Sequence, residues 1–518
     1  MADTLLYASL LLPLVASLII AIGWLTGINR GEDGERFTSN IMQLAVLASL
    51  LLLVTISLAF FFDPLILPAR HSTGNWFSSG SISVPFELLF DYYSLMFGPL
   101  IMLISLITIK FSQNYLHREA GFQRFHIVIG LFTSAMLLIA YSGNAIVAFI
   151  GWELAGVSSY LLIAYSYERP VATENATRAF VTNRIGDAGF LTAIFFGLVW
   201  FDSTSWIIDE PSWISKAEHY QLDLIALGFI VAAMAKSATV PFSAWITRAL
   251  EGPTPSSAIF YGAVMVHAGV FLLIRIEPLI QEVLLLQVVL IIVGLLTVAY
   301  GFFGGLVQTD VKTAFMFSTT GQVGLMFIFC GLGFEQLAFV YLLAHAIWRS
   351  YQFLHAPAHM HLSNQSARSV PPWLKHYKWL YTAAVQRFWL DNLSNALFVK
   401  PINSLANEIH VFDEQVVNRI AGMQEQVGAL TSLTDWENRR RAEDKPGIAS
   451  GRGVLGKLLE TVATALHWFE EHLVLKSGGD NLINLIHKLG YYAERTDKLL
   501  SQPRYLWLLI LTTLVVII

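Results

Sequence analysis

Long runs of apolar residues, separated by short polar stretches, make up most of the chain. About 20 consecutive apolar residues are enough for a helix to cross a bilayer, so each run predicts a membrane-spanning helix. Eleven such spans are expected before residue 360, at 5–27, 39–61, 91–112, 124–142, 144–166, 178–201, 220–242, 254–276, 281–306, 311–332 and 334–357. A twelfth, shorter span is expected at Tyr505–Ile518.

The stretch before the last span has a different pattern. Charged residues are frequent in it, as in ENRRRAEDK, yet apolar residues recur at helical spacing in FVKPINSLANEIHVFDEQVVNRI and LLETVATALHWFEEHLVL. This pattern is typical of amphipathic helices that lie on a membrane or on a partner protein. The chain is therefore predicted to be an all-α polytopic membrane protein with about 12 transmembrane helices. Its expected parts are a transmembrane domain at 1–358, a cytoplasmic or interfacial amphipathic helical segment at 359–504 and a C-terminal transmembrane helix at 505–518.

Composition agrees with a membrane protein and excludes several kinds of chemistry. Of the 518 residues, 55% are hydrophobic and 13% charged, and the mean hydropathy is +0.58, which lies outside the range of soluble proteins. The single cysteine, Cys330, allows neither a disulfide framework nor a thiolate metal or iron–sulfur site. No Walker sequence occurs and no GxGxxG is found after a strand, so nucleotide hydrolysis is not expected in this chain. No nucleic-acid partner is expected either. The first run has no basic region before it and is expected to remain as a helix.

Basic residues predict the orientation of the chain in the membrane. They gather in the loops after odd-numbered spans, whereas loops after even-numbered spans carry few. The first group comprises Arg30, Arg36, Arg118, Arg124, Arg169, Arg178 and Arg248, and the second Arg70, Lys216 and Arg275. Because short cytoplasmic loops carry the excess of Lys and Arg, we expect a periplasmic N-terminus and a cytoplasmic segment 359–504.

Two ionisable residues lie well inside apolar runs. Glu153 is in IVAFIGWELAGVSSYLL and Lys236 is in LIALGFIVAAMAKSATVPFSAW. A charge at such depth costs several kcal/mol unless it is paired or reaches water. Pro241 follows Lys236 closely, and proline removes a helical hydrogen bond and breaks the helix. The pattern favours a proton relay, with a structural ion pair that locks two helices as the alternative.

Further ionisable residues recur along the later spans. Arg184 and Asp187 are three apart on one helix face, where they can pair. His267 lies near the middle of its span and titrates near neutral pH, so it is a candidate proton carrier or a partner for a backbone carbonyl.

The tenth and eleventh spans extend this series. Lys312 and His345 are further candidate carriers, whereas Arg349 stays protonated and can only set the local potential. His345 and Arg349 share a helix face. A histidine group follows at His355, His359 and His361, but no carboxylates stand at metal-ligand spacing beside it, so a metal site is not expected.

Several motifs in fixed order carry a family resemblance. GWELAGVSSYLLIAY, ATRAFVTNRIGDAGF, KSATVPFSAWITRALEGPTPSSAI, MVHAGVFLLIR, VKTAFMFSTTGQVGLMF and HAIWRSYQFL together resemble the NuoL- and Mrp-type antiporter-like proton-translocating subunits of respiratory complex I and of multisubunit cation/proton antiporters. The match runs from about Asp91 to Leu354. It implies two inverted repeats of five helices and a coupled pair at Glu153 and Lys236, the lysine in a broken helix.

Departures from the family pattern point to a shortened relative. His345-Ala346-Ile347-Trp348-Arg349 stands where the family commonly has a lysine, and no counterpart of the second broken helix is found, so a truncated second repeat is expected. Such a chain is similar to the membrane subunits of bacterial DAB inorganic-carbon-accumulation complexes. That resemblance implies a bacterial inner-membrane protein, no cofactor in this chain, and a large soluble zinc-binding carbonic-anhydrase-like (DabA-like) partner on the cytoplasmic face that hydrates CO2 to bicarbonate.

Three alternatives stay open at this point. The chain could be a subunit of a redox-driven complex I relative, a cation/proton antiporter subunit, or a membrane anchor whose charges only lock helices. The sequence does not decide between protons and sodium, since a carboxylate and a lysine serve either ion.

Overall fold

The computed structural model describes residues 2–62, 69–79, 82–206, 217–356 and 370–412. The described residues fall into two compact units, one that contains those up to residue 395 and one that begins at residue 396. The domain boundary predicted at residue 358 lies outside the described residues, as do the amphipathic segment beyond residue 412 and the last predicted span.

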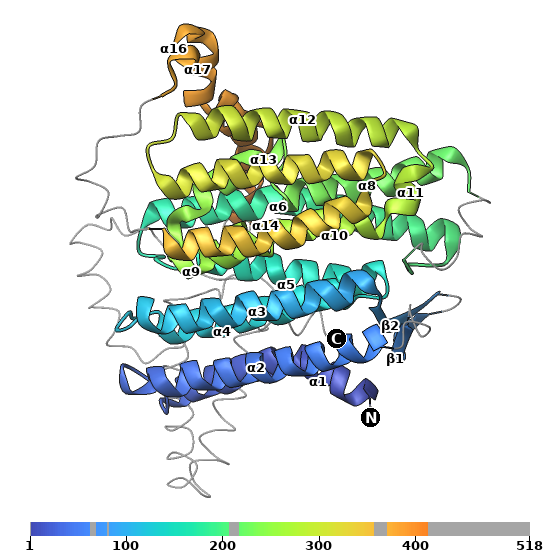
Figure 1. Ribbon diagram of the computed structural model, residues 1–518, viewed down its shortest axis with the longest axis vertical. Helices are drawn as coiled ribbons and strands as arrows, with labels where there is room; N and C mark the ends of the chain where they lie inside the picture. Colours follow the sequence, from blue (N-terminus) through green and yellow to red (C-terminus); the bar gives the residue numbers. More distant parts are fainter. Residues whose placement is uncertain (1, 63–68, 80–81, 207–216, 357–369, 413–518) are drawn as a thin grey trace, which may run out of the picture. The chain divides into compact units, whose positions relative to one another are not determined.

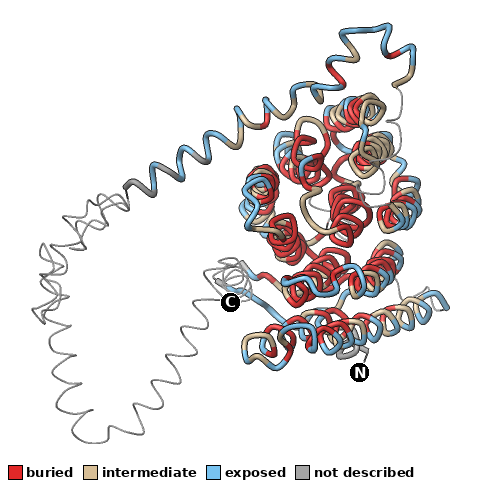
Figure 2. Tube along the Cα trace, turned by 90° about the vertical axis from the view of Figure 1, so that its left-hand side faces the viewer, coloured by how far each residue is buried: buried red, intermediate tan, exposed pale blue. Residues whose placement is uncertain are grey.

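The first unit consists mainly of long helices that run alongside one another (Figure 1). They are α1 (Ala2–Thr26), α2 (Asp33–Phe62), α3 (Tyr92–Tyr115), α4 (Phe122–Tyr141), α5 (Ala145–Ile163), α6 (Pro170–Phe201), α8 (His219–Lys236), α9 (Thr254–Ser257), α10 (His267–Arg275), α11 (Glu277–Gln281), α12 (Leu284–Leu306), α13 (Val311–Gly331) and α14 (Glu335–His355). Buried residues gather on the sides of the helices that face one another, while the outer sides are exposed (Figure 2). In water this exposed apolar surface would aggregate, and in a membrane it faces lipid.

Each of the eleven spans predicted before residue 360 contains helix. Nine helical segments of the described chain are long and apolar enough to cross a membrane. The predicted spans 220–242 and 334–357 also form helices, α8 and α14, but these carry more polar side chains. The chain is thus a mostly helical, multi-pass membrane protein.

Two predicted spans are interrupted. The span expected at 220–242 ends its helix at Lys236, and a turn followed by two 3-10 helices, η3 (Phe242–Ala244) and η4 (Ile246–Glu251), takes over. The span expected at 254–276 contains a π-helix, η5 (Ala258–Ala263), between α9 and α10. Departures from regular helix free backbone groups, and both of these lie next to predicted site residues.

One hairpin adds strands to the predicted all-α fold. Strands β1 (Ala69–Ser79) and β2 (Ile82–Phe90) pair antiparallel, with irregular register between Ser72 and Phe77. Asp91 follows β2 directly and caps α3, its carboxylate accepting a hydrogen bond from the Ser94 amide at 2.9 Å. The hairpin thus leads into α3.

Close backbone packing fixes α6 against α8. A Cβ added to Gly228 would lie 2.6 Å from the carbonyl oxygen of Gly189, and one added to Gly189 would lie 2.8 Å from that of Gly228. Small residues of this kind let helices approach closely in membranes. The approach holds the two helices that carry Arg184, Asp187 and Lys236 side by side.

Shorter helices follow residue 370. They are α16 (Pro372–His376), α17 (Lys378–Val385), η6 (Arg387–Trp389), α18 (Leu390–Ser394), η7 (Asn395–Val399) and α19 (Lys400–Phe412). Asp391 of α18 forms a 2.8 Å ion pair with Arg248 of η4, which ties α18 to the rest of the first unit. In α19 the exposed apolar residues Ile402, Leu405 and Ile409 recur at helical spacing, in agreement with the predicted amphipathic pattern.

Candidate functional site: a line of charges inside the helix bundle

Arg184 is paired with two carboxylates. Its guanidinium forms an ion pair with Glu153 of α5 and, through Nε, a 3.1 Å ion pair with Asp187 one turn along α6. The pairing of Arg184 with Asp187 is therefore as the sequence spacing predicts. The contact with Glu153 joins α5 to α6. The spacing of residues along one helix could not predict this contact between two helices.

Lys236 lies beside this group as the last residue of α8. Its side chain is 1% exposed, donates a 3.0 Å hydrogen bond to the Trp152 carbonyl and stands 4.9 Å from the centre of the Trp152 ring. The Trp152 indole in turn donates to Asp187 at 2.7 Å. Within the described part of the chain, Glu153 forms its ion pair with Arg184 and none with Lys236.

Gly156 shows how close the two cations are. A Cβ added at this position would lie 3.2 Å from Arg184 Nη2 and 3.4 Å from Lys236 Nζ. Two positive groups therefore face the same glycine, one turn from Glu153 on α5. The four ionisable residues Glu153, Arg184, Asp187 and Lys236 form one group, which we call the charge cluster.

A turn connects the charge cluster to the next helices. After Lys236 the backbone leaves the α-helix, and Ala238 adopts a left-handed conformation with φ of 52°. Ser237 donates a 2.7 Å hydrogen bond to the carbonyl of Val266, the residue before His267. The Val240 amide donates to Thr297 of α12 at 3.0 Å. The break next to Lys236 is thus bonded to the start of α10 and to α12.

His267 and His345 contact each other. Nε2 of His267 and Nδ1 of His345 are 2.9 Å apart, and both rings are buried between α10 and α14. One of the two nitrogens donates and the other accepts, so a proton is shared along this line. The residues are 78 positions apart, and sequence analysis selected both without predicting the contact.

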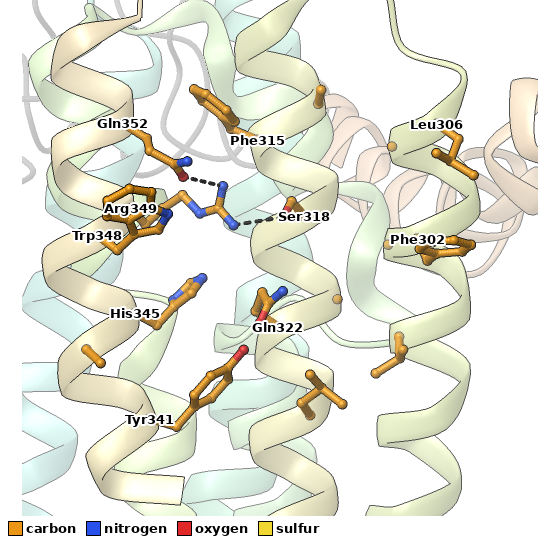
Figure 3. Close-up of a pocket in the computed structure, with 17 residues that line it drawn as sticks. Phe302, Leu306, Phe315, Ser318, Gln322, Tyr341, His345, Trp348, Arg349 and Gln352 are labelled. Atoms are coloured by element: carbon orange, nitrogen blue, oxygen red, sulfur yellow. Dashed lines mark hydrogen bonds between the residues drawn. The ribbon is translucent and has the colours of Figure 1, made fainter. Parts of the chain in front are cut away.

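Arg349 lies one turn beyond His345 on α14. Its guanidinium donates to Gln352 and to Ser318 of α13, both at 2.8 Å. Figure 3 shows Arg349, His345, Gln322 and Tyr341 pointing into a space between α13 and α14, and a cavity of about 680 Å³ extends from there to α12.

Lys312 is separate from this group. It lies at the start of α13 and donates a 2.6 Å hydrogen bond to Thr254, which also bonds Tyr115 at 2.9 Å. Lys312 therefore belongs to one end of the bundle, where α3, α9 and α13 meet. The structure brings the other seven predicted residues into two groups, the charge cluster and the line from His267 to Arg349.

The described residues include no group of three His, Cys, Asp or Glu side chains placed to hold a metal ion. His355 stacks on Tyr351 with ring centres 5.6 Å apart, while His359 and His361 lie outside the described residues. Sequence reasoning did not single out Trp152, Ser237 or Ser318, since uncharged polar groups in a helix give no signal of their own.

Family comparisons cover this region. The family described as "NADH:quinone oxidoreductase/Mrp antiporter, TM" matches residues 142–371, and the one described as "NADH-Ubiquinone oxidoreductase (complex I), chain 5 N-terminus" matches residues 76–126. These residues belong to the antiporter-like family of membrane subunits. All eight predicted site residues fall within 142–371. Antiporter-like membrane subunits carry no cofactor of their own.

Individual relatives agree with this assignment. NAD(P)H-quinone oxidoreductase subunit 5 of Paulinella chromatophora is 31% identical over 364 residues, which is 68% of this chain and 53% of the relative. NADH-quinone oxidoreductase subunit L of Mycobacterium tuberculosis is 35% identical over 292 residues, 56% of this chain and 46% of the relative. The chain spans about half the length of the curated relatives it matches.

Solved structures share the fold. The Mrp complex from Dietzia sp. DQ12-45-1b contains a chain that aligns with a TM-score of 0.58 at 18% identity, covering 98% of this chain and 62% of that chain. The archaeal membrane-bound sulfane sulfur reductase contains one with a TM-score of 0.56 at 19% identity, covering 67% of this chain and 55% of that chain.

Proposed function

We propose that this antiporter-like chain is a proton-conducting membrane subunit of a larger complex. One observation carries the proposal. A buried cluster of two carboxylates, an arginine and a lysine lies at a helix break, in a region where an ionisable group without a role is costly. Intramembrane acids, lysines and histidines in such positions are typical of proton relays.

The contacts suggest a sequence of transfers. A proton arriving at Glu153 weakens its hold on Arg184, which then pairs more strongly with Asp187 and raises the positive potential at Lys236. Lys236 releases its proton toward the turn at Ser237, and the shared proton of His267 and His345 carries the charge onward. In this scheme Arg184, Asp187 and Arg349 set the local potential, and Lys312 exchanges protons at one end of the bundle.

The test is reconstitution of the purified complex into liposomes with a pH-sensitive dye inside. An imposed potassium gradient with valinomycin sets the membrane voltage, and the initial rate of internal pH change is measured with and without sodium. Conduction that is independent of sodium supports protons as the coupling ion. Conduction that requires sodium favours the cation/proton antiporter alternative.

The finer proposal is that this proton flow drives inorganic carbon accumulation by a soluble partner. Support comes from the resemblance to DAB membrane subunits and from the charged, amphipathic sequence after residue 358, which suits docking on a soluble protein. In this proposal the N-terminus is periplasmic, residues 359–504 are cytoplasmic, and the zinc belongs to a carbonic-anhydrase-like partner at the bacterial inner membrane that converts CO2 to bicarbonate. In this division of the chain, residues 1–358 conduct protons and residues 359–504 bind the soluble partner. Residues 505–518 form the last transmembrane helix.

Affinity purification in mild detergent tests this partner. The tagged chain is isolated, and zinc content and co-purifying proteins are measured together. A stoichiometric large soluble protein that holds zinc supports the inorganic-carbon function. Flavin and iron–sulfur subunits in its place make the chain a component of a redox-driven complex I relative.

A further inference from the structure

Arg349 carries a positive charge without a negative partner among the described residues. Its side chain is 4% exposed, and both of its hydrogen bonds go to neutral groups, the Gln352 amide oxygen and the Ser318 hydroxyl. Its Nε, although buried, has no hydrogen-bond partner. Arg184 and Arg275, by contrast, each face a carboxylate. Arginine does not lose its proton, so the charge of Arg349 needs a counter-charge from elsewhere.

The cavity beside Arg349 has room for such a counter-charge. Its volume is about 680 Å³, far more than the roughly 30 Å³ that one water molecule takes up in the liquid. Its lining contains no Asp or Glu. The polar lining side chains are Ser318, Gln322, Tyr341, His345, Arg349 and Gln352. Each of these side chains has a hydrogen that can be donated, so together with the guanidinium they suit an anion.

His345 adds a second unsatisfied buried group. Its ring is 6% exposed, its Nδ1 bonds His267, and its Nε2 has no partner. In the tautomer that accepts from His267 at Nδ1, Nε2 carries the hydrogen and is a donor. Figure 3 shows this ring pointing into the same space as Arg349 and Gln322. Two nearly buried side chains therefore lie beside one cavity, and each has a nitrogen without a hydrogen-bond partner among the described residues.

Depth in the membrane narrows the chemistry of the ligand. His345 is the midpoint of α14, and Arg349 lies four residues from it, or roughly 6 Å along the axis at 1.5 Å per residue. In an α14 that crosses the bilayer about its midpoint, Arg349 lies inside the roughly 30 Å hydrocarbon core, whereas phospholipid headgroups lie at its edge, about 15 Å from the centre. Arg349 has one positive charge, so a ligand with one negative charge neutralises it. A ligand with two negative charges would leave one of them uncompensated.

We propose that this cavity binds a small monovalent inorganic anion, chloride or bicarbonate, between Arg349, Gln322 and His345. The bound anion is the counter-ion of Arg349. It lies next to the histidine pair, so its presence stabilises a proton shared between His267 and His345. In the proposed proton path, a bound anion at this site would therefore change the rate of proton transfer through His267 and His345.

Direct binding tests the proposal on the full-length chain with its co-purifying subunits, in nanodiscs of zwitterionic lipid. Radiolabelled chloride and radiolabelled bicarbonate are titrated separately, with gluconate as the replacement anion, and each is then used to compete against the other. We expect saturable binding of at least one of the two, and the competition shows which the site prefers. If neither chloride nor bicarbonate binds saturably, the proposal is wrong. The counter-charge of Arg349 then comes from another source, such as a lipid or an acidic helix of a partner.

Three variants locate the site. Arg349→Gln is expected to weaken binding at least about tenfold, a change of roughly 1.4 kcal/mol. Gln322→Glu keeps the side-chain size but places a fixed carboxylate in the cavity, so it is expected to abolish binding even if Arg349→Gln does not fold. Arg248→Gln, which removes the same charge from a half-exposed ion pair with Asp391, is the matched control and should bind as the wild type does. Unchanged binding in Gln322→Glu overturns the proposal.

Discussion

Replacing Lys236 by methionine separates a transport role from a structural one. In an anchor whose charges lock helices, this change would lower stability more than activity. In a proton path it removes the residue at the end of α8 that holds and releases a proton, while the side-chain length is nearly unchanged. The two roles therefore predict opposite results for stability and conduction.

The expected change in stability is small because its contributions have opposite signs. Removing an ammonium group from the membrane interior relieves roughly 2.5–3.5 kcal/mol on insertion scales. Losing the hydrogen bond to the Trp152 carbonyl costs roughly 1–3 kcal/mol. Losing the contact with the Trp152 ring costs about 2 kcal/mol in a desolvated site. With losses of roughly 3–5 kcal/mol against a gain of roughly 2.5–3.5 kcal/mol, the free energy of unfolding should rise by at most about 0.5 kcal/mol or fall by at most about 2.5 kcal/mol.

Two measurements on the same preparation check this. Thermal unfolding of the purified chain is followed with a thiol-reactive fluorescent dye, because its single cysteine, Cys330, is buried and reacts only on unfolding. Proton conduction is measured in liposomes and should fall at least about tenfold, equivalent to roughly 1.4 kcal/mol in the rate barrier. Lys110→Met, at an exposed lysine of α3, is the control and should change neither. Full conduction by a stable Lys236→Met protein would refute the reasoning.

Other predictions follow from the buried charges. Glu153→Gln leaves Arg184 with one carboxylate and should reduce proton conduction in the liposome assay; equal rates would remove Glu153 from the path. Gly156→Ala adds a methyl group 3.2 Å from Arg184 Nη2, so we expect slower conduction with little change in the thermal midpoint, and a collapsed midpoint would show a packing role instead. Arg275→Gln leaves Asp91 unpaired in the interior and should cost about 3–5 kcal/mol of stability, seen as earlier dye reaction on heating. A midpoint equal to that of the wild type would contradict it.

The runs of apolar residues predicted most of the fold. Hydrophobicity alone determines where a helix can cross a membrane, so the helices up to residue 356 fall close to the predicted spans. The hairpin at 69–90 was missed, because strands of nine to eleven residues do not register in a search for long apolar runs. Arg275 was counted as a loop charge, but it ends α10 and is 1% exposed, and it pairs there with Asp91 and donates to the Ala140 carbonyl.

The site was predicted residue by residue but not as an arrangement. Ionisable residues in apolar runs stand out in any sequence, which is why Glu153 and Lys236 were selected. Their partners lie on other helices. Glu153 pairs with Arg184 and not with Lys236 because of how α5, α6 and α8 pack. The histidine pair likewise needs α10 and α14 to meet. Contacts between different helices cannot be predicted from the spacing of residues in a single sequence.

The end of α8 at Lys236 has an electrostatic consequence of its own. Aligned peptide dipoles give the C-terminal end of a helix roughly half a negative charge, and a cation in the last turn gains about 0.3–1 kcal/mol from it. Lys236 occupies that last turn inside the protein, where water screens the dipole little. The backbone itself thus helps to hold the proton on the lysine. If α8 continued as a regular helix to residue 242, Lys236 would lie in mid-helix, where this contribution of the dipole is absent.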